Sequence, residues 1–135
     1  MNVKQRTVGE LMSRDLITIG ASETLRTAAA LMHARRIHCL LVQPEAPRGA
    51  VGIITGKDVV QVLCDAEPAL LDQLTVGDAM STPAVSVQRE FLVGDAIKLM
   101  RGAGVRSVPV LDGVQLVGLL SFSDVLRAAL EAGEP

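Results

Sequence analysis

The chain has 135 residues, enough for one compact module with a real core, and 49 % of them are hydrophobic. Aromatic residues make up only 1 %, so the core must be built from aliphatic side chains. The 13 basic and 15 acidic residues, with almost no aromatic rings to stack on bases, argue against nucleic acid as the main partner.

The N-terminus and the two cysteines indicate the cellular setting. Residues 1–6 are polar, and neither a signal peptide nor a run of roughly 20 apolar residues follows them, so we expect a cytoplasmic protein with no membrane partner. Cys39 and Cys64 suit a reducing compartment, where we expect two buried thiols, with a redox pair as the alternative. With 2 cysteines and 2 histidines at no metal-ligand spacing, a zinc site is not expected.

The sequence is duplicated. Seven residues from Thr7 (TVGELMS) return from Thr75 (TVGDAMS), 68 positions later (75 − 7), and GIITGKD at residues 52–58 returns as GLLSFSD at residues 118–124, 66 positions later (118 − 52). We therefore expect two repeats, at residues 7–66 and 75–132, joined by a connector at residues 67–74. Two such like units are expected to face each other, which makes the cleft between them the first place to look for function.

The same elements are predicted in both repeats. Each opens with a short helix, where Thr7 or Thr75 forms a capping box with the acidic residue three positions on, Glu10 or Asp78. Extended stretches follow at residues 16–19 and 84–87, then longer helices at 23–36 and from 93 to 104. Strand pairs are expected at 39–42 with 50–54 and at 107–111 with 116–120, joined by turns at 43–49 and 112–113; final helices are expected at 56–65 and 122–131. This order predicts an α/β (α+β) fold.

Each repeat carries one further motif where its last strand meets its last helix. The pairs Thr55/Asp58 and Ser121/Asp124 have capping-box spacing, and a purely structural cap is the simplest interpretation. The functional interpretation uses the same geometry, because a helix N-terminus favours phosphate and a carboxylate one turn in accepts hydrogen bonds from the vicinal hydroxyls of a sugar. Lys57 and Ser123 add polar groups at this point, and a glycine three residues before the hydroxyl, Gly52 or Gly118, permits close backbone approach or a local bulge.

These residues together resemble the CBS domain family, over nearly the whole chain and as a tandem pair. The motifs that carry the resemblance are Val-Gly-x-x-Met-Ser at the start of each repeat, SVPVLD at residues 107–112, and Gly-h-h-Ser/Thr-x-x-Asp (h, hydrophobic) in each repeat. The resemblance implies two β-α-β-β-α units packed through their sheets about a pseudo-twofold axis, often dimerised as a flat disc. It also implies a regulatory sensor of AMP, ADP, ATP, S-adenosylmethionine or NADH that acts on a separate partner protein.

The resemblance also implies two nucleotide-binding clefts. In each, the Asp holds the ribose, the hydroxyl residue and a basic residue address the phosphates, and the adenine lies against the first strand of the other repeat. The first cleft combines Leu16 and Ile17 with Arg106, Ser121, Ser123 and Asp124. The second combines Ala84 and Val85 with His38, Thr55, Lys57 and Asp58. Ser13 and Ser81 are weaker candidates at the cleft edges.

The two implied sites differ in charge. His38 stands where the other repeat has Arg106, and a histidine with a pKa of about 6.5 is mostly neutral at cytoplasmic pH, so it is a weaker phosphate partner. For both residues an ordinary surface position is the alternative. Leu41 replaces Pro109 and Lys57 replaces Ser123, which adds to the asymmetry. We therefore expect two related sites with unequal preferences.

The possible functions fall into three classes: a ligand-binding regulatory module, a structural module and an enzyme. A regulatory module that binds an adenosine nucleotide, AMP or ATP above all, without any required cofactor, suits the repeated Asp motif best. S-adenosylmethionine or NADH as ligand, or a structural homodimerisation module with empty clefts, are the alternatives. The chain has no nucleophile elbow, metal cluster or phosphate-binding P-loop, so an enzyme is not expected.

Overall fold

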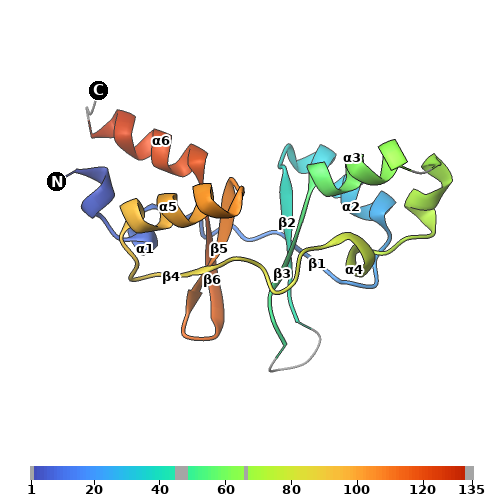
Figure 1. The fold of residues 1–135 in the computed structure, drawn as a ribbon, viewed down its shortest axis with the longest axis horizontal. Helices are drawn as coiled ribbons and strands as arrows, with labels where there is room; N and C mark the ends of the chain where they lie inside the picture. Colours follow the sequence, from blue (N-terminus) through green and yellow to red (C-terminus); the bar gives the residue numbers. More distant parts are fainter. Residues whose placement is uncertain (1, 45–48, 66, 133–135) are drawn as a thin grey trace. The chain divides into compact units, whose positions relative to one another are not determined.

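The computed structural model describes residues 2–44, 49–65 and 67–132, with the side chain of residue 65 left out, and it divides into two compact units. Unit 1 comprises Met1–Leu16 and Val85–Pro135, and unit 2 comprises Ile17–Ala84. Each unit contains its own three-stranded sheet with helices, which confirms the expected mixed α/β class (Figure 1).

Unit 2 is built on the sheet order β1-β2-β3, in which β1 is parallel to β2 and β2 is antiparallel to β3. Its elements are β1 (Thr18–Ile19), α2 (Leu25–Arg35), β2 (Cys39–Val42), β3 (Gly52–Thr55), α3 (Gly56–Asp65), the 3₁₀ helix η2 (Pro68–Asp72) and α4 (Val76–Ala79). A parallel pair needs a crossover, and α2 supplies it between β1 and β2.

Unit 1 repeats this arrangement with the sheet order β4-β5-β6. Its elements are the 3₁₀ helix η1 (Val3–Gln5), α1 (Val8–Leu11), β4 (Val87–Gln88), α5 (Val93–Ala103), β5 (Ser107–Asp112), β6 (Gln115–Ser121) and α6 (Phe122–Glu131). The crossover between the parallel strands β4 and β5 is α5.

The units do not coincide with the repeats in the sequence, because the opening helix of each repeat packs in the other unit. In Figure 1, α1 (blue) lies among the elements of the C-terminal half, and α4 lies among those of the N-terminal half. Isolated backbone bridges hold each helix there: Thr7 pairs with Leu92 in unit 1, and Thr24 pairs with Thr75 in unit 2. Each compact unit therefore needs chain from both repeats.

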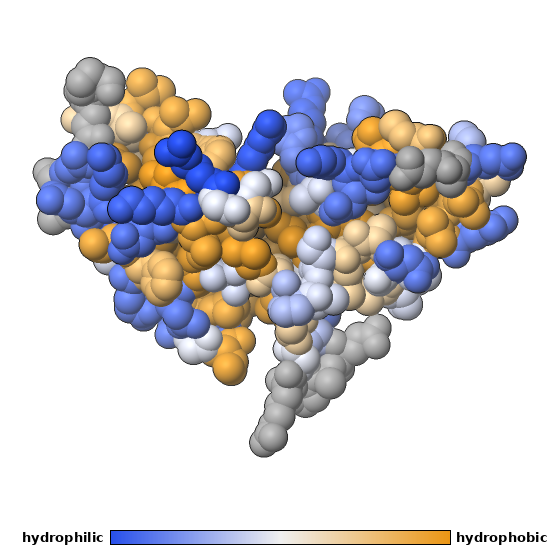
Figure 2. Space-filling view, in the orientation of Figure 1, coloured by the Kyte–Doolittle hydropathy of each residue, from blue (hydrophilic) through white to orange (hydrophobic). Residues whose placement is uncertain are grey.

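Each unit has its own aliphatic core, as the composition predicts. The largest fully buried side chains in unit 2 include Leu25, Leu40 and Ile54, and in unit 1 they include Met100 and Leu120. Among the methionines, those at 12, 32 and 100 are buried, and the one at 80 is partly buried against the unit 2 core. Exposed aliphatic side chains lie on α6, where Leu126 is 65 % and Leu130 is 77 % exposed, and apolar surface gathers over this helix (Figure 2).

Several predicted boundaries shift by one to three residues. The extended stretches shorten to the two-residue strands β1 and β4, the first long helix starts at Leu25, and the hairpin turn is Gly113–Val114 because Asp112 still pairs with Gln115. Gly113 takes a φ of 64°, which glycine adopts without strain. Of the predicted turn at residues 43–49, positions 45–48 lie outside the described residues, as does residue 66 of the segment after α3.

Two local expectations were wrong. Cys64 is exposed on α3 rather than buried, because it lies on the solvent side of an amphipathic helix, while Cys39 is half-buried. The capping box expected at Thr7 does not form, because the Thr7 side chain makes no capping hydrogen bond to the helix. The Thr7 hydroxyl donates instead to the Glu10 carboxylate at 3.2 Å, and Arg6 donates to the same carboxylate at 3.0 Å. At α4 the box carboxylate does reach back, since Thr75 N donates to Asp78 Oδ2 at 2.8 Å.

Candidate functional site

The junction of β6 and α6 in unit 1 forms a closed cap. The Ser121 backbone N and hydroxyl both donate to Asp124 Oδ2, at 2.9 and 3.0 Å, and Asp124 N donates back to the Ser121 hydroxyl at 3.3 Å. The chain forms this cap because Ser121 ends the strand in extended conformation and the acidic side chain lies one turn on. The pair thereby fixes a hydroxyl and a carboxylate at the start of a ten-residue helix.

The junction of β3 and α3 in unit 2 has the same geometry. Thr55 N and its hydroxyl donate to Asp58 Oδ2 at 2.8 and 3.0 Å, and Asp58 N donates to the Thr55 hydroxyl at 3.2 Å. In both units, therefore, the motif is a structural cap, as its simplest interpretation requires. The cap also presents the carboxylate in a fixed orientation, so the two interpretations are compatible.

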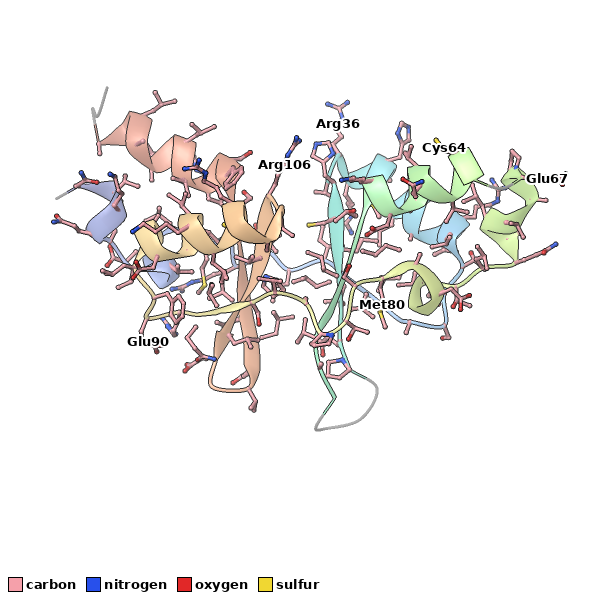
Figure 3. The ribbon with its side chains drawn as sticks, in the orientation of Figure 1. Arg36, Cys64, Glu67, Met80, Glu90 and Arg106 are labelled. Atoms are coloured by element: carbon pink, nitrogen blue, oxygen red, sulfur yellow. The ribbon has the colours of Figure 1, made fainter. Side chains whose placement is uncertain are left out.

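A basic residue is tied to each helix start through its backbone. Phe122 N donates to the Arg106 carbonyl at 3.1 Å in unit 1, and Gly56 N donates to the His38 carbonyl at 2.8 Å in unit 2. The Arg106 and His38 side chains are exposed, and Figure 3 shows Arg106 projecting away from the strands of its unit. The structure thus brings the predicted basic residue, hydroxyl and carboxylate together within each unit.

The motif glycines, Gly52 and Gly118, leave room for a second segment of the chain that pairs with the next residue of the strand. Ser13 pairs with Leu119 on β6, with N–O distances of 2.8 and 3.0 Å, and Ser81 pairs with Ile53 on β3, at 2.9 and 3.0 Å. A Cβ on Gly118 would lie 3.0 Å from the Ser13 carbonyl oxygen and closer still to Met12. The predicted close backbone approach is therefore confirmed, and it is made by the chain itself.

The crossing segments position two more of the predicted site residues. Leu16 follows the Ser13 bridge and belongs to unit 1 with Asp124, and Ala84 belongs to unit 2 with Asp58, where its N donates to the Val51 carbonyl at 2.9 Å. Ile17 and Val85 fall just beyond the division of the chain, in units 2 and 1 respectively, so their part in a site with Asp124 or Asp58 stays a prediction.

Each helix start also presents a polar side chain to solvent, Ser123 in unit 1 and Lys57 in unit 2, both exposed. Phe122 N donates to the Arg106 carbonyl and Asp124 N donates to the Ser121 hydroxyl, so among the described residues the N–H of Ser123 is left for an external acceptor. Backbone N–H groups and the helix dipole at this point favour an anion, while the carboxylate accepts from hydroxyl groups. The arrangement suits a ligand that carries both phosphate and vicinal hydroxyls.

One residue at the site was missed by the sequence reasoning. Arg127 Nη2 donates to Asp124 Oδ1 at 2.6 Å, forming an ion pair one turn into α6. The signal was present, because a cation three residues after a carboxylate on a predicted helix lies on the same face. Three further arginines, at 35, 36 and 101, are exposed, and so is His33.

No helix in the described ranges is long and apolar enough to cross a bilayer. Across the same ranges, no group of three or more His, Cys, Asp or Glu side chains is placed to hold a metal ion.

A family model for the CBS domain matches residues 8–65 and 76–131. The chain therefore belongs to the CBS domain family, and it contains a tandem pair of these domains. CBS domain proteins are generally regulatory rather than catalytic.

Curated relatives support the family assignment. A CBS domain-containing protein of Dictyostelium discoideum is 33 % identical over 139 residues, covering 95 % of this chain and 94 % of that protein. An uncharacterized protein of Methanopyrus kandleri is 32 % identical over 122 residues, covering 89 % of this chain. The chain spans 61 % of that protein's length and 32 % of the length of a Methanocaldococcus jannaschii relative.

Solved structures share the fold. The hexameric CBS-CP12 protein from bloom-forming cyanobacteria matches with a TM-score of 0.86 at 28 % identity, covering 96 % of this chain and 75 % of that one. The CBS domain pair of MJ0100, solved with 5-methylthioadenosine and S-adenosyl-L-methionine, matches with a TM-score of 0.78 at 23 % identity. That match covers 95 % of this chain and 97 % of the other.

Proposed function

We propose that this chain is a cytoplasmic regulatory module that binds an adenine nucleotide, AMP or ATP, at the starts of α6 and α3. The observation that carries the proposal is the cap with its tethered basic residue, present in both units: Ser121, Asp124 and Arg106 in one, Thr55, Asp58 and His38 in the other. The MJ0100 pair, which has the same fold, was solved with two adenosine-derived ligands, and this supports the choice of ligand class.

Each group has an assigned role in the proposed complex. The Asp carboxylate accepts from the two ribose hydroxyls, and the free helix N–H donates to a phosphate oxygen. The Ser or Thr hydroxyl releases its bond to the Asp carboxylate and donates to a second phosphate oxygen. Arg106 adds a permanent positive charge in unit 1, where unit 2 has His38 instead. Leu16 with Ile17 and Ala84 with Val85 provide the aliphatic surfaces for the adenine. The partner that reads the occupied state is a separate protein.

The test is calorimetric titration with AMP, ATP, NADH and S-adenosylmethionine on the wild type, Asp58→Asn, Asp124→Asn and the double variant. We expect micromolar to millimolar dissociation constants, one site lost in each single variant, and no binding in the double variant. Asn keeps the shape of the cap and removes the charge. Unchanged binding by the double variant would show that the sites are wrongly assigned.

A matched control separates loss of ligand contact from loss of a helix cap. Asp78 caps α4 by accepting from Thr75 N at 2.8 Å but carries no proposed ligand contact. Asp78→Asn should therefore leave every dissociation constant unchanged. If NADH or S-adenosylmethionine binds and the mononucleotides do not, the site assignment stands and the ligand changes; if nothing binds, a structural role is favoured.

We also propose that the chain forms a homodimer. Leu126 and Leu130 lie one turn apart on α6, and Val60 and Leu63 are exposed on α3, where Val60 occupies the position equivalent to Leu126 (126 − 66). Exposed aliphatic side chains on the same helix of each unit, at one position shared by both, suit burial against another copy. The hexameric CBS-CP12 neighbour supports self-association as a property of this fold.

A further inference from the structure

The two site carboxylates have different surroundings. Asp124 is only 7 % exposed, and both of its oxygens are engaged: Oδ2 by Ser121, and Oδ1 by Arg127 at 2.6 Å. Asp58 is half-buried, and its Oδ2 accepts from the backbone N and the hydroxyl of Thr55. The position equivalent to Arg127 is Gln61 (127 − 66), which carries no charge.

The different surroundings of the two carboxylates should affect the binding of ribose, whose hydroxyls donate to the carboxylate. They should not affect phosphate directly, because other groups contact the phosphate. A ribose needs the carboxylate oxygen that points away from the cap, and in unit 1 that oxygen already has a charge-assisted hydrogen bond. A neutral hydroxyl is a weaker donor than a guanidinium, so it does not displace Arg127 without cost. The Arg127 side chain is itself 60 % exposed, so water and salt screen the pair and keep that cost modest.

We propose that Arg127 is a specificity-determining residue that holds the Asp124 carboxylate closed to ribose. The inference rests on the proposed function and deepens it. A ligand with ribose and no phosphate fills the Asp58 site first. The Asp124 site depends on phosphate contacts with Arg106 and Ser121 to displace Arg127, so its preference for nucleotide over nucleoside is the greater of the two.

Adenosine is the probe that isolates this effect, because it carries the ribose and no charge. Asp58→Asn leaves only the Asp124 site and Asp124→Asn leaves only the Asp58 site. In the Asp58→Asn background, Arg127→Gln should tighten adenosine binding about 3- to 10-fold, the size of a charge-assisted contact after screening. In the Asp124→Asn background the same change should alter it by less than about 2-fold, within the scatter of independent sites.

Placing an arginine at the equivalent position of unit 2 should make the Asp58 carboxylate less available to ribose as well. Gln61→Arg in the Asp124→Asn background should weaken adenosine binding about 3- to 10-fold by the same screened contact. Arg127→Lys keeps the charge without the planar fork and should give an intermediate affinity.

Salt dependence gives a readout that a merely structural role of Arg127 would not move. Raising NaCl from about 50 to about 500 mM should tighten adenosine binding at the Asp124 site while Arg127 is present, and leave it unchanged in Arg127→Gln. Adenosine binding that is unchanged or weaker in Arg127→Gln overturns the inference and leaves the proposed function intact. Failure of both adenosine and ATP to bind the wild type removes the proposed function and the inference together.

Discussion

Units 1 and 2 keep the same framework and differ in the charges placed on it. Both have a strand, a hydroxyl–carboxylate cap, a helix, and a glycine crossed by a segment that begins with Met-Ser. Around the carboxylate, unit 1 has Arg106 and Arg127, whereas unit 2 has His38, Gln61 and Lys57. The backbone geometry of the site is therefore duplicated, and its electrostatics are not.

The comparison separates what the fold requires from what the ligand selects. The cap supplies hydrogen-bond partners to backbone N–H groups, and the glycine allows close packing of a second segment. Neither unit can therefore lose them without losing stability. Exposed charges at the helix start are not needed for folding, and they are free to diverge. Differences in ligand preference between the two units should therefore trace to these side chains.

The largest expected difference between the units is in the stability cost of substituting the motif glycines, Gly118 and Gly52. A Cβ on Gly118 would lie 2.9 Å from Met12 Cγ and 3.0 Å from the Ser13 carbonyl oxygen; on Gly52 the nearest atoms are Met80 Sδ at 2.9 Å and the Ser81 oxygen at 3.4 Å. A flexible thioether end moves aside more easily than backbone. Gly118→Ala should lower the free energy of unfolding by about 2–3 kcal/mol, and Gly52→Ala by about 1 kcal/mol.

Urea unfolding measures both changes, with Gly102→Ala as the matched control. A Cβ at this position on α5 meets nothing within 4 Å, so the substitution should stabilise the protein by about 0.5–1 kcal/mol. Equal losses at Gly118 and Gly52 would contradict the difference in packing between the units.

The sequence predicted the fold well wherever a local rule applied in both repeats. The final helices, 56–65 and 122–131, begin and end as expected, because a cap at one end and an amphipathic pattern along the length both mark them. The two-residue strands were predicted too long, since their ends depend on pairing with a distant strand. The exchange of α1 and α4 between units also went unpredicted, because periodicity within a repeat carries no information about which core a helix joins.

The candidate site was predicted in part for the same reason. Ser121, Asp124, Thr55 and Asp58 were found because a motif with a known geometry contains them. Arg127 was missed because it lies outside the motif, although its i+3 spacing from Asp124 indicated the pair. The solvent position of Cys64 was missed because cysteine is on average a buried residue type, whereas the amphipathic pattern of α3 places this one on the solvent side.

The apolar surfaces of α6 and α3 offer a second comparison between the units. Leu126 and Leu130 are more exposed than Val60 and Leu63, so α6 has more apolar area to bury in a dimer. Leu126→Glu with Leu130→Glu should therefore weaken self-association at least about 10-fold, and Val60→Glu with Leu63→Glu by less. Light scattering with size-exclusion chromatography over a concentration series measures the dissociation.

A control for added charge is Val114→Glu in the β5–β6 turn. Val114 is more exposed than any other large hydrophobic side chain among the described residues, but it stands alone at the tip of a hairpin. Its substitution should leave the oligomeric state unchanged. A wild type that is monomeric at all concentrations, or α6 variants that associate as the wild type does, would count against the dimer.

The smallest expected difference between the units is in their response to acid. In unit 2, Arg26 donates to Asp72 through two nitrogens, at 2.5 and 3.1 Å, and joins α2 to η2, whereas the position equivalent to Arg26 in unit 1 is Gly94 (26 + 68). The hydrogen bonds from Arg26 hold the pKa of the Asp72 carboxyl below its usual range.

A carboxyl whose folded pKa lies below its unfolded value of about 3.9 stabilises the fold above that value, and the stabilisation is lost as pH falls through the folded pKa. Asp72→Asn should therefore lower the stability of unit 2 slightly at pH 7, and the effect should disappear as the pH falls below the folded pKa, where the wild-type carboxyl is protonated too. Hydrogen exchange resolved by unit measures this, and an equal effect in both units, or one that persists in acid, would show that the ion pair is not its source.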